Sequence, residues 1–152
     1  VIHVDISDMN MPNDKFDLVF SFRALKYVRN RKRTLYNIKN FLRRNGYALI
    51  EMPNLFNPFY FFPYKLAPFL IHFSDRESMR YLIFSDFISK GSFVKELKRV
   101  GLKVEKIKTL FFFPHSIYSK IGNKRYLKII YTMDNILSRF FPRSLIFVVK
   151  YE

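Results

Sequence analysis

The sequence contains no cysteine, and this absence excludes several kinds of chemistry at once. Without a thiol there is no disulfide framework, no zinc site with cysteine ligands and no cysteine nucleophile. A chain without cysteine is compatible with a reducing compartment, so we expect a cytoplasmic protein.

Glycine is also scarce, with 4 residues in the whole chain. The two closest, Gly91 and Gly101, stand ten positions apart. The G-x-G-x-x-G and Walker phosphate-binding loops both need glycines within about five positions of each other. These 152 residues therefore contain neither loop.

Acidic residues are few, because 12 Asp and Glu stand against 27 Lys and Arg, for a formal net charge of +15 at pH 7. Such a surplus favours an anionic partner, for example a nucleic acid, a phospholipid or a phosphorylated substrate. AT-rich codons offer a second origin for the charge, because they encode the abundant Lys, Ile, Asn, Phe and Tyr. From Arg23 to Arg44 nine residues are basic and none is acidic. An anion-facing helix and a solvated helix face both explain this stretch.

The residues that are present are typical of one globular domain. Hydrophobic residues make up 49% of the chain and charged residues 26%, a balance that can bury a core. Strand-like and helix-like segments alternate, which predicts an α/β fold with a largely parallel sheet. The short apolar run from Phe16 to Ser21 is typical of a strand buried on both faces. The expected elements are strands over 1–6 and 16–21, a helix through Leu35, Ile38 and Leu42 that ends at Asn45-Gly46, a strand over 47–52, a helix over 89–100 between Ser89 and Gly101, a strand over 102–113, a helical stretch over 116–141 broken near Gly122, and a strand over 144–151.

Several short motifs follow one another in the first 54 residues. An apolar segment ends in Asp5, Phe16-Asp17-Leu18-Val19 opens the next strand, and Leu25-Lys26-Tyr27-Val28 follows it. A helix then closes in Leu42-Arg43-Arg44-Asn45-Gly46, and a further strand ends in Pro53-Asn54. This ordered set resembles the class I S-adenosylmethionine-dependent methyltransferases, and residues 89–108 are similar to the segment that leads into the sixth strand of that family.

The resemblance implies a Rossmann-like methyltransferase sheet that is mostly parallel, with an antiparallel last strand between the fifth and sixth. The family's glycine loop and the acidic residue after its second strand do not occur here. Residue 1 is Val, and a strand pattern begins at once. We therefore expect residues 1–152 to be the C-terminal part of one methyltransferase domain, incomplete at the N-terminus. Tyr27 also stands where many members have His, and Asn45 replaces the first glycine of a pair.

An aromatic block from Leu55 to Phe73 lies where this family inserts elements that cover the substrate. The resemblance thus implies a substrate-side insertion over about 55–86. It could form a lid over an apolar acceptor, contact a membrane interface, or pack as core. A transmembrane helix is excluded because the block is interrupted by Pro58, Pro63, Pro68, Asn57, Lys65 and His72.

The resemblance also implies a site for S-adenosylmethionine. Asp5, at the carboxyl end of a parallel strand, would accept a hydrogen bond from the adenine amino group, and the backbone N–H of Ile6 would reach a ring nitrogen. Asp8 is the alternative carboxylate, and an Asp that caps a turn is the structural alternative. Ser21 and Phe22 correspond to family positions that line the cofactor and acceptor.

Methyl transfer needs no nucleophilic side chain, because the cofactor supplies the reactive group and the protein aligns the acceptor with it. His72 and His115 are candidates for a general base, and Tyr27 for a residue that orients the acceptor. Each of the three could instead be structural. No residues are predicted to hold a metal.

The predicted activity is methyl transfer from S-adenosylmethionine to a small-molecule or lipid-linked acceptor. The alternatives are a non-catalytic methyltransferase-like module and a basic membrane- or nucleic-acid-binding module. The basic stretch and the aromatic block together allow a peripheral contact with an anionic membrane surface at its inner face. Nucleic acid is the weaker partner, because the chain has no RNP-type motif and its aromatic residues are not interleaved with base-reading polar residues.

Overall fold

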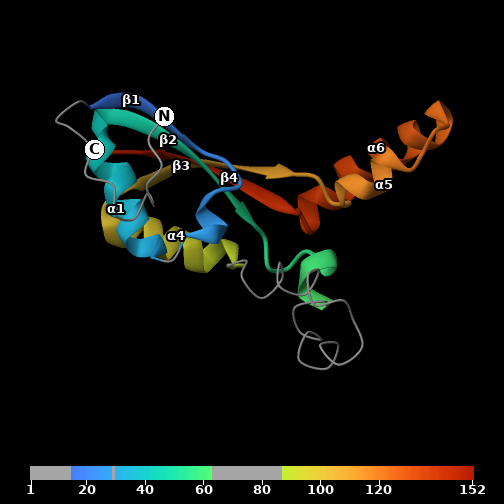
Figure 1. Cartoon of the computed structure of the whole chain (residues 1–152), viewed down its shortest axis with the longest axis horizontal. Helices are drawn as coiled ribbons and strands as arrows, with labels where there is room; N and C mark the ends of the chain where they lie inside the picture. Colours follow the sequence, from blue (N-terminus) through green and yellow to red (C-terminus); the bar gives the residue numbers. More distant parts are fainter. Residues whose placement is uncertain (1–14, 29, 63–86) are drawn as a thin grey trace.

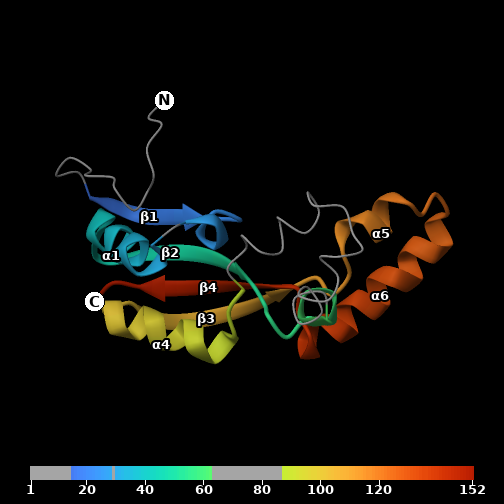
Figure 2. The ribbon, with the colours of Figure 1, turned by 60° about the horizontal axis from the view of Figure 1, so that its bottom comes forward.

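The computed structural model describes residues 15–28, 30–62 and 87–152. They form a four-stranded sheet of β1 (Phe16–Ser21), β2 (Leu42–Pro53), β3 (Lys103–Leu110) and β4 (Ser144–Lys150). The strand order is β1-β2-β4-β3. β1 pairs with β2 in parallel, and β4 is antiparallel to both of its neighbours. The predicted mixed sheet, with its last strand inserted antiparallel, is confirmed (Figures 1 and 2).

Two helices, α1 (Arg31–Phe41) and α4 (Lys90–Val100), cover one face of this sheet (Figure 2). Asn30 and Ser89 cap their N-termini, because each side chain accepts a hydrogen bond from a backbone N–H three residues on. Arg31 of α1 donates two hydrogen bonds of 2.8 Å to Glu96 of α4 and so ties the helices together. The buried core between helices and sheet includes Leu35, Ile38, Ala48, Ile50, Met52, Phe93, Leu97, Phe147 and Val149.

The end of α4 follows the predicted pattern. Gly101 adopts the left-handed conformation with φ 81°, and the N–H of Leu102 donates to the carbonyl of Leu97 at 3.0 Å. Glycine suits this position because it has no Cβ to clash in that conformation. The chain then enters β3 directly.

The predicted end of the first helix is wrong. α1 ends at Phe41, and Leu42 is already extended and paired with Phe16. Residues 43–46 of β2 form a bulge relative to β1, whose pairing with β2 resumes at Tyr47, and Asn45 has a φ of 65°. A Cβ on Gly46 would lie 2.9 Å from the carbonyl oxygen of Arg43, so this glycine permits close backbone packing rather than ending a helix.

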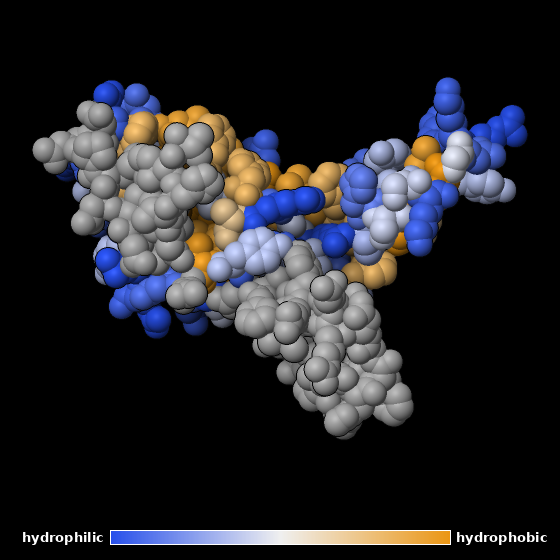
Figure 3. Space-filling view, viewed as in Figure 1, coloured by the Kyte–Doolittle hydropathy of each residue, from blue (hydrophilic) through white to orange (hydrophobic). Residues whose placement is uncertain are grey.

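Burial of β1 on both faces was also a wrong expectation. Phe16, Leu18 and Phe20 are 40%, 45% and 60% exposed, because the described helices lie against the opposite face. Figure 3 shows apolar side chains along this edge of the molecule. The strand predicted over 1–6 lies outside the described residues.

A helical hairpin of α5 (His115–Ser119) and α6 (Lys124–Phe140) projects beyond one end of the sheet (Figures 1 and 2). The predicted break near Gly122 is confirmed, since the two helices are separated at residues 120–123. Asn123 starts α6 by accepting a hydrogen bond from the N–H of Arg125 at 2.9 Å.

Candidate functional site

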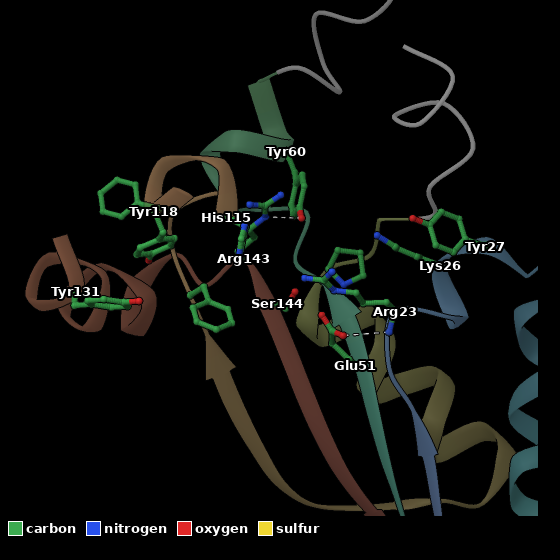
Figure 4. Close-up of a pocket in the computed structure, with 13 residues that line it drawn as sticks. Arg23, Lys26, Tyr27, Glu51, Tyr60, His115, Tyr118, Tyr131, Arg143 and Ser144 are labelled. Carbon is green, nitrogen blue, oxygen red and sulfur yellow. Dashed lines mark hydrogen bonds between the residues drawn. The ribbon is translucent and has the colours of Figure 1, made fainter. Parts of the chain in front are cut away.

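The carboxyl ends of β1, β2 and β3 meet the amino end of β4 at one edge of the sheet. Open α/β sheets bind their ligands at this edge. A cavity of about 590 Å³ lies here, between the strand ends and the α5–α6 hairpin (Figure 4). Among the described residues its lining is cationic and aromatic, with a single carboxylate: Arg23, Lys26, Tyr27, Glu51, Pro53, Tyr60, Phe111, Phe113, His115, Tyr118, Tyr131, Arg143 and Ser144.

Asn54 joins the loop after β2 to the segment before β4. Its Nδ2 donates to the carbonyl of Pro142 at 3.0 Å, and its backbone N–H donates to the carbonyl of Arg143 at 2.9 Å. Both partners are more than eighty residues away in sequence. This side chain therefore fixes where β4, and with it Arg143, begins.

Asn57 makes a second set of connections. Its side chain is fully buried, and its Nδ2 donates to the carbonyls of Phe112 at 3.1 Å and Phe141 at 2.8 Å. Its Oδ1 accepts from the N–H of Phe59 at 3.1 Å. One amide thus links three loops that form the walls of the cavity.

Asp134 of α6 supports the loop after β3. This buried carboxylate accepts hydrogen bonds from the N–H groups of Phe112 at 2.7 Å and Phe113 at 2.9 Å. The turn is sharp, since Phe111 has a positive φ of 45°. Charge-assisted hydrogen bonds to two neighbouring donors hold such a turn in place, and so keep Phe113 and His115 at the cavity.

Arg143 is the best-oriented cation of the cavity. Its Nε donates to the Tyr60 hydroxyl at 2.7 Å, and its guanidinium lies 5.0 Å from the centre of the Tyr60 ring (Figure 4). Within the described part of the chain, no carboxylate forms an ion pair with Arg143. Its terminal nitrogens can therefore receive an acidic group from a ligand.

Tyr118 and Tyr131 form the far wall, with their rings stacked 5.1 Å apart. The Tyr118 hydroxyl is buried and has no hydrogen-bond partner among the described residues. Burial raises the pKa of this phenol well above its usual range, and the nearby Asp134 carboxylate adds to the effect. Tyr118 is therefore a neutral donor near pH 7 and not a base.

Two of the residues predicted to contact the cofactor, Ser21 and Phe22, lie at the carboxyl end of β1. Ser21 is 5% exposed, and its Oγ has no hydrogen-bond partner among the described residues. Phe22 is 45% exposed and stacks on Phe20, with ring centres 6.1 Å apart. Beyond them, Arg23 has a φ of 55°, and its N–H donates to Glu51 at 3.1 Å.

These two residues fit a ligand with a polar edge and a flat ring, as the adenosine part of S-adenosylmethionine has. The orphaned hydroxyl of Ser21 can pair with a polar group, and the Phe22 ring offers an apolar surface. Both remain predictions as cofactor contacts. Asp5, Ile6 and the alternative Asp8 lie outside the described residues.

The three candidates for catalysis, Tyr27, His72 and His115, do not all lie at the cavity among the described residues. Tyr27 and His115 both line the cavity, from opposite sides of it (Figure 4). His72 lies outside the described residues. In the part of the chain that the structure describes, no three His, Asp or Glu side chains gather closely enough to hold a metal ion.

The basic stretch from Arg23 to Arg44 is divided among several roles. Arg31 pairs with Glu96, Arg43 pairs with Asp17, and Lys26 is 8% exposed beside the cavity. Lys32 and Arg44 are exposed. The described residues of the stretch therefore do not form one continuous anion-binding face.

Sequence reasoning missed the residues that shape the cavity: Asn57, Tyr60, Asp134 and Arg143. Asp134 had a signal, because it is the only acidic residue between Glu105 and Glu152. Tyr60 was hidden among the many aromatic residues of the block, and Asn57 was noted only as an interruption of it.

A family model for a methyltransferase domain matches residues 1–50. No curated protein matches the chain in sequence. In the described part of the chain, no helix has both the length and the apolar character that crossing a membrane requires.

Solved structures match nearly the whole chain. A Thermotoga maritima S-adenosylmethionine-dependent methyltransferase, described as a possible histamine N-methyltransferase, matches with TM-score 0.64 and 12% identity over 97% of this chain and 61% of its own. A Mesorhizobium loti methyltransferase matches with TM-score 0.59 and 16% identity, covering 97% of this chain and 67% of its own. The cyclase SpnF matches with TM-score 0.56 and 11% identity over 97% of this chain and 54% of its own.

These matches establish the fold, and the cyclase among them shows that one fold carries more than one reaction. The chain spans 61% of the length of the Thermotoga structure. The chain is therefore similar to a methyltransferase domain over residues 1–50, and it shares its fold with solved S-adenosylmethionine-dependent methyltransferases.

Proposed function

We propose that this chain is the acceptor-side part of a cytoplasmic S-adenosylmethionine-dependent methyltransferase. Its acceptor would be a small molecule or a lipid-linked molecule that carries an acidic group. The acidic group is inferred from Arg143, which lines the cavity at the ligand-binding edge of the sheet. Its Nε donates a hydrogen bond of 2.7 Å to the Tyr60 hydroxyl, which fixes the guanidinium in place.

The charge of the cavity supports an anionic acceptor. Of the described residues, Arg23, Lys26 and Arg143 line it together with one carboxylate, Glu51. Glu51 accepts a hydrogen bond from the backbone N–H of Arg23. A cationic cavity with fixed geometry favours a carboxylate or phosphate, because guanidinium groups bind both through paired hydrogen bonds.

The aromatic lining supports an acceptor with a flat or apolar body. Tyr27, Tyr60, Phe113, Tyr118 and Tyr131 surround the space, and aromatic walls give large contact area with little loss of side-chain freedom. Such walls would also keep water from the reacting methyl group.

The division of labour follows from these positions. S-adenosylmethionine, when bound, supplies an activated methyl group. Ser21 and Phe22 would contact it at the end of β1, together with Asp5 and Ile6. Arg143 would orient the acceptor by its acidic group, and Tyr27 by its hydroxyl. His115 is the candidate to accept the proton that a hydroxyl acceptor releases.

The test uses the intact protein, radiolabelled S-adenosylmethionine and a panel of aromatic hydroxy acids, each matched with its uncharged amide. We expect transfer to acids and not to amides. Arg143→Gln should raise KM for an accepted acid by at least about tenfold, since a charged hydrogen-bonding partner is lost. Arg44→Gln, which removes an exposed charge of the same kind, is the control and should leave KM unchanged.

Equal KM values for the two variants would remove Arg143 from the acceptor site. Binding of acids without any methyl transfer would favour the alternative of a non-catalytic methyltransferase-like module. Calorimetry with S-adenosylmethionine alone measures cofactor binding separately from acceptor binding. Arg143→Gln should not change cofactor affinity.

A further inference from the structure

Helix α6 exposes a row of apolar side chains along one face. Tyr126, Ile129, Met133, Ile136 and Phe140 are 61%, 55%, 46%, 54% and 71% exposed. Their spacing alternates between three and four residues, which places all five on one side of a helix. We call these five residues the α6 stripe.

A helix that only packs against its own domain is expected to bury its apolar side chains and to expose its polar ones. The residues of α6 that are buried are Asp134 and Ser138, which are polar. A helix whose two buried residues are polar, while isoleucine, methionine and phenylalanine are exposed, has an apolar face without a partner among the described residues. The hairpin that carries this face projects from the body (Figures 1 and 2).

The charge beside the α6 stripe indicates what covers it. The residue before each stripe residue is polar and exposed, and three of these five are cationic: Arg125, Lys128, Thr132, Asn135 and Arg139. The one acidic residue of α6, Asp134, is buried against backbone donors. An apolar stripe flanked by cations is typical of a helix that lies in the headgroup region of a membrane.

We propose that the α6 stripe docks onto an anionic lipid surface. The stripe would enter the boundary between headgroups and acyl chains, while Arg125, Lys128 and Arg139 would contact lipid phosphates. A second copy of the chain is less suited, because two α6 helices side by side would bring like charges together without exposed acids to offset them. The proposal does not depend on methyl transfer. It does bring the cavity close to the membrane, since Tyr118 of α5 and Tyr131 of α6 belong to its wall.

A flotation assay tests the proposal with the intact protein and vesicles of phosphatidylcholine containing about one third phosphatidylglycerol. Ile129→Gln with Ile136→Gln should lower the partition coefficient about a hundredfold, because two exposed apolar side chains no longer insert. Thr132→Gln with Asn135→Gln is the matched control on the neighbouring face and should bind like the unaltered protein. Vesicles of phosphatidylcholine alone should bind the unaltered protein at least about tenfold more weakly.

A fluorescence measurement gives independent evidence, because the chain contains no tryptophan. Ile129→Trp should shift its emission to shorter wavelength with anionic vesicles, and Asn135→Trp should not. The proposal is overturned if the unaltered protein does not float, if both double variants float equally, or if neutral vesicles bind as well. A dimer in solution that only the stripe variant dissociates, without vesicle binding, would assign the face to a second copy.

Discussion

Asn57 holds together three loops of the cavity, so its removal should have a large effect for one side chain. Asn57→Ala deletes two donor bonds, to Phe112 and Phe141, and one acceptor bond from Phe59. Each net hydrogen bond contributes about 1 kcal/mol, and the groups left behind are shielded from water. We expect the free energy of unfolding to fall by about 3 kcal/mol, which corresponds to a melting temperature lower by about 6–12 °C.

The measurement is urea unfolding followed by circular dichroism, with a thermal melt beside it. Asn135→Ala is the control, because Asn135 is exposed on α6, and it should change stability by less than about 0.5 kcal/mol. Asn57→Asp keeps the size but points an oxygen at two carbonyl oxygens, so it should destabilise at least as much as alanine. A loss below about 0.5 kcal/mol for Asn57→Ala, or a harmless Asn57→Asp, would refute the account of the linked loops.

Two further predictions concern a helix end and a buried phenol. Gly101→Ala should cost about 1 kcal/mol, because φ is 81° there, whereas Gly91→Ala near the start of α4, with no atom within 4 Å of an added Cβ, should stabilise by about 0.5–1 kcal/mol. Urea unfolding of both variants checks this, and effects of the same sign would contradict it. The raised pKa of Tyr118 contributes stability that is present below the ordinary tyrosine pKa of about 10 and is lost as pH rises through and beyond it. Unfolding measured between about pH 9 and 11 should therefore show a steeper decline for the unaltered protein than for Tyr118→Phe, and identical slopes would argue against burial of this hydroxyl.

The order and direction of the strands could be predicted because local signals and the family resemblance agreed. Ser89 and Gly101 mark both ends of α4, and the structure places them as N-cap and left-handed C-cap. The predicted end of the helix before β2 was wrong for a physical reason. Asn45 and Gly46 do need an unusual backbone, but they form part of a bulge inside the strand, where Asn45 is left-handed and Gly46 lies against the carbonyl of Arg43.

The cavity could be predicted only in outline. Tyr27 and His115 were candidates because of their residue types, and both line it. The side chains that set its shape act over distances in sequence that no local pattern records. Asn54 bonds to a residue 88 positions away, and the Arg143 Nε bonds to the hydroxyl of a residue 83 positions away.

β1 and the α6 stripe both expose apolar side chains, and the sequences of the two segments distinguish their roles. β1 places Phe16, Leu18 and Phe20 on one side with Val19 packed against the core on the other. Such a run, apolar on both faces, is typical of a strand that protein covers on both sides. The α6 stripe instead alternates with cationic and polar residues that remain exposed beside it. Protein cores exclude such unpaired cations, while a lipid headgroup layer supplies their counterions. The difference in pattern, and not the exposed apolar area alone, is why the lipid surface is assigned to α6 and not to β1.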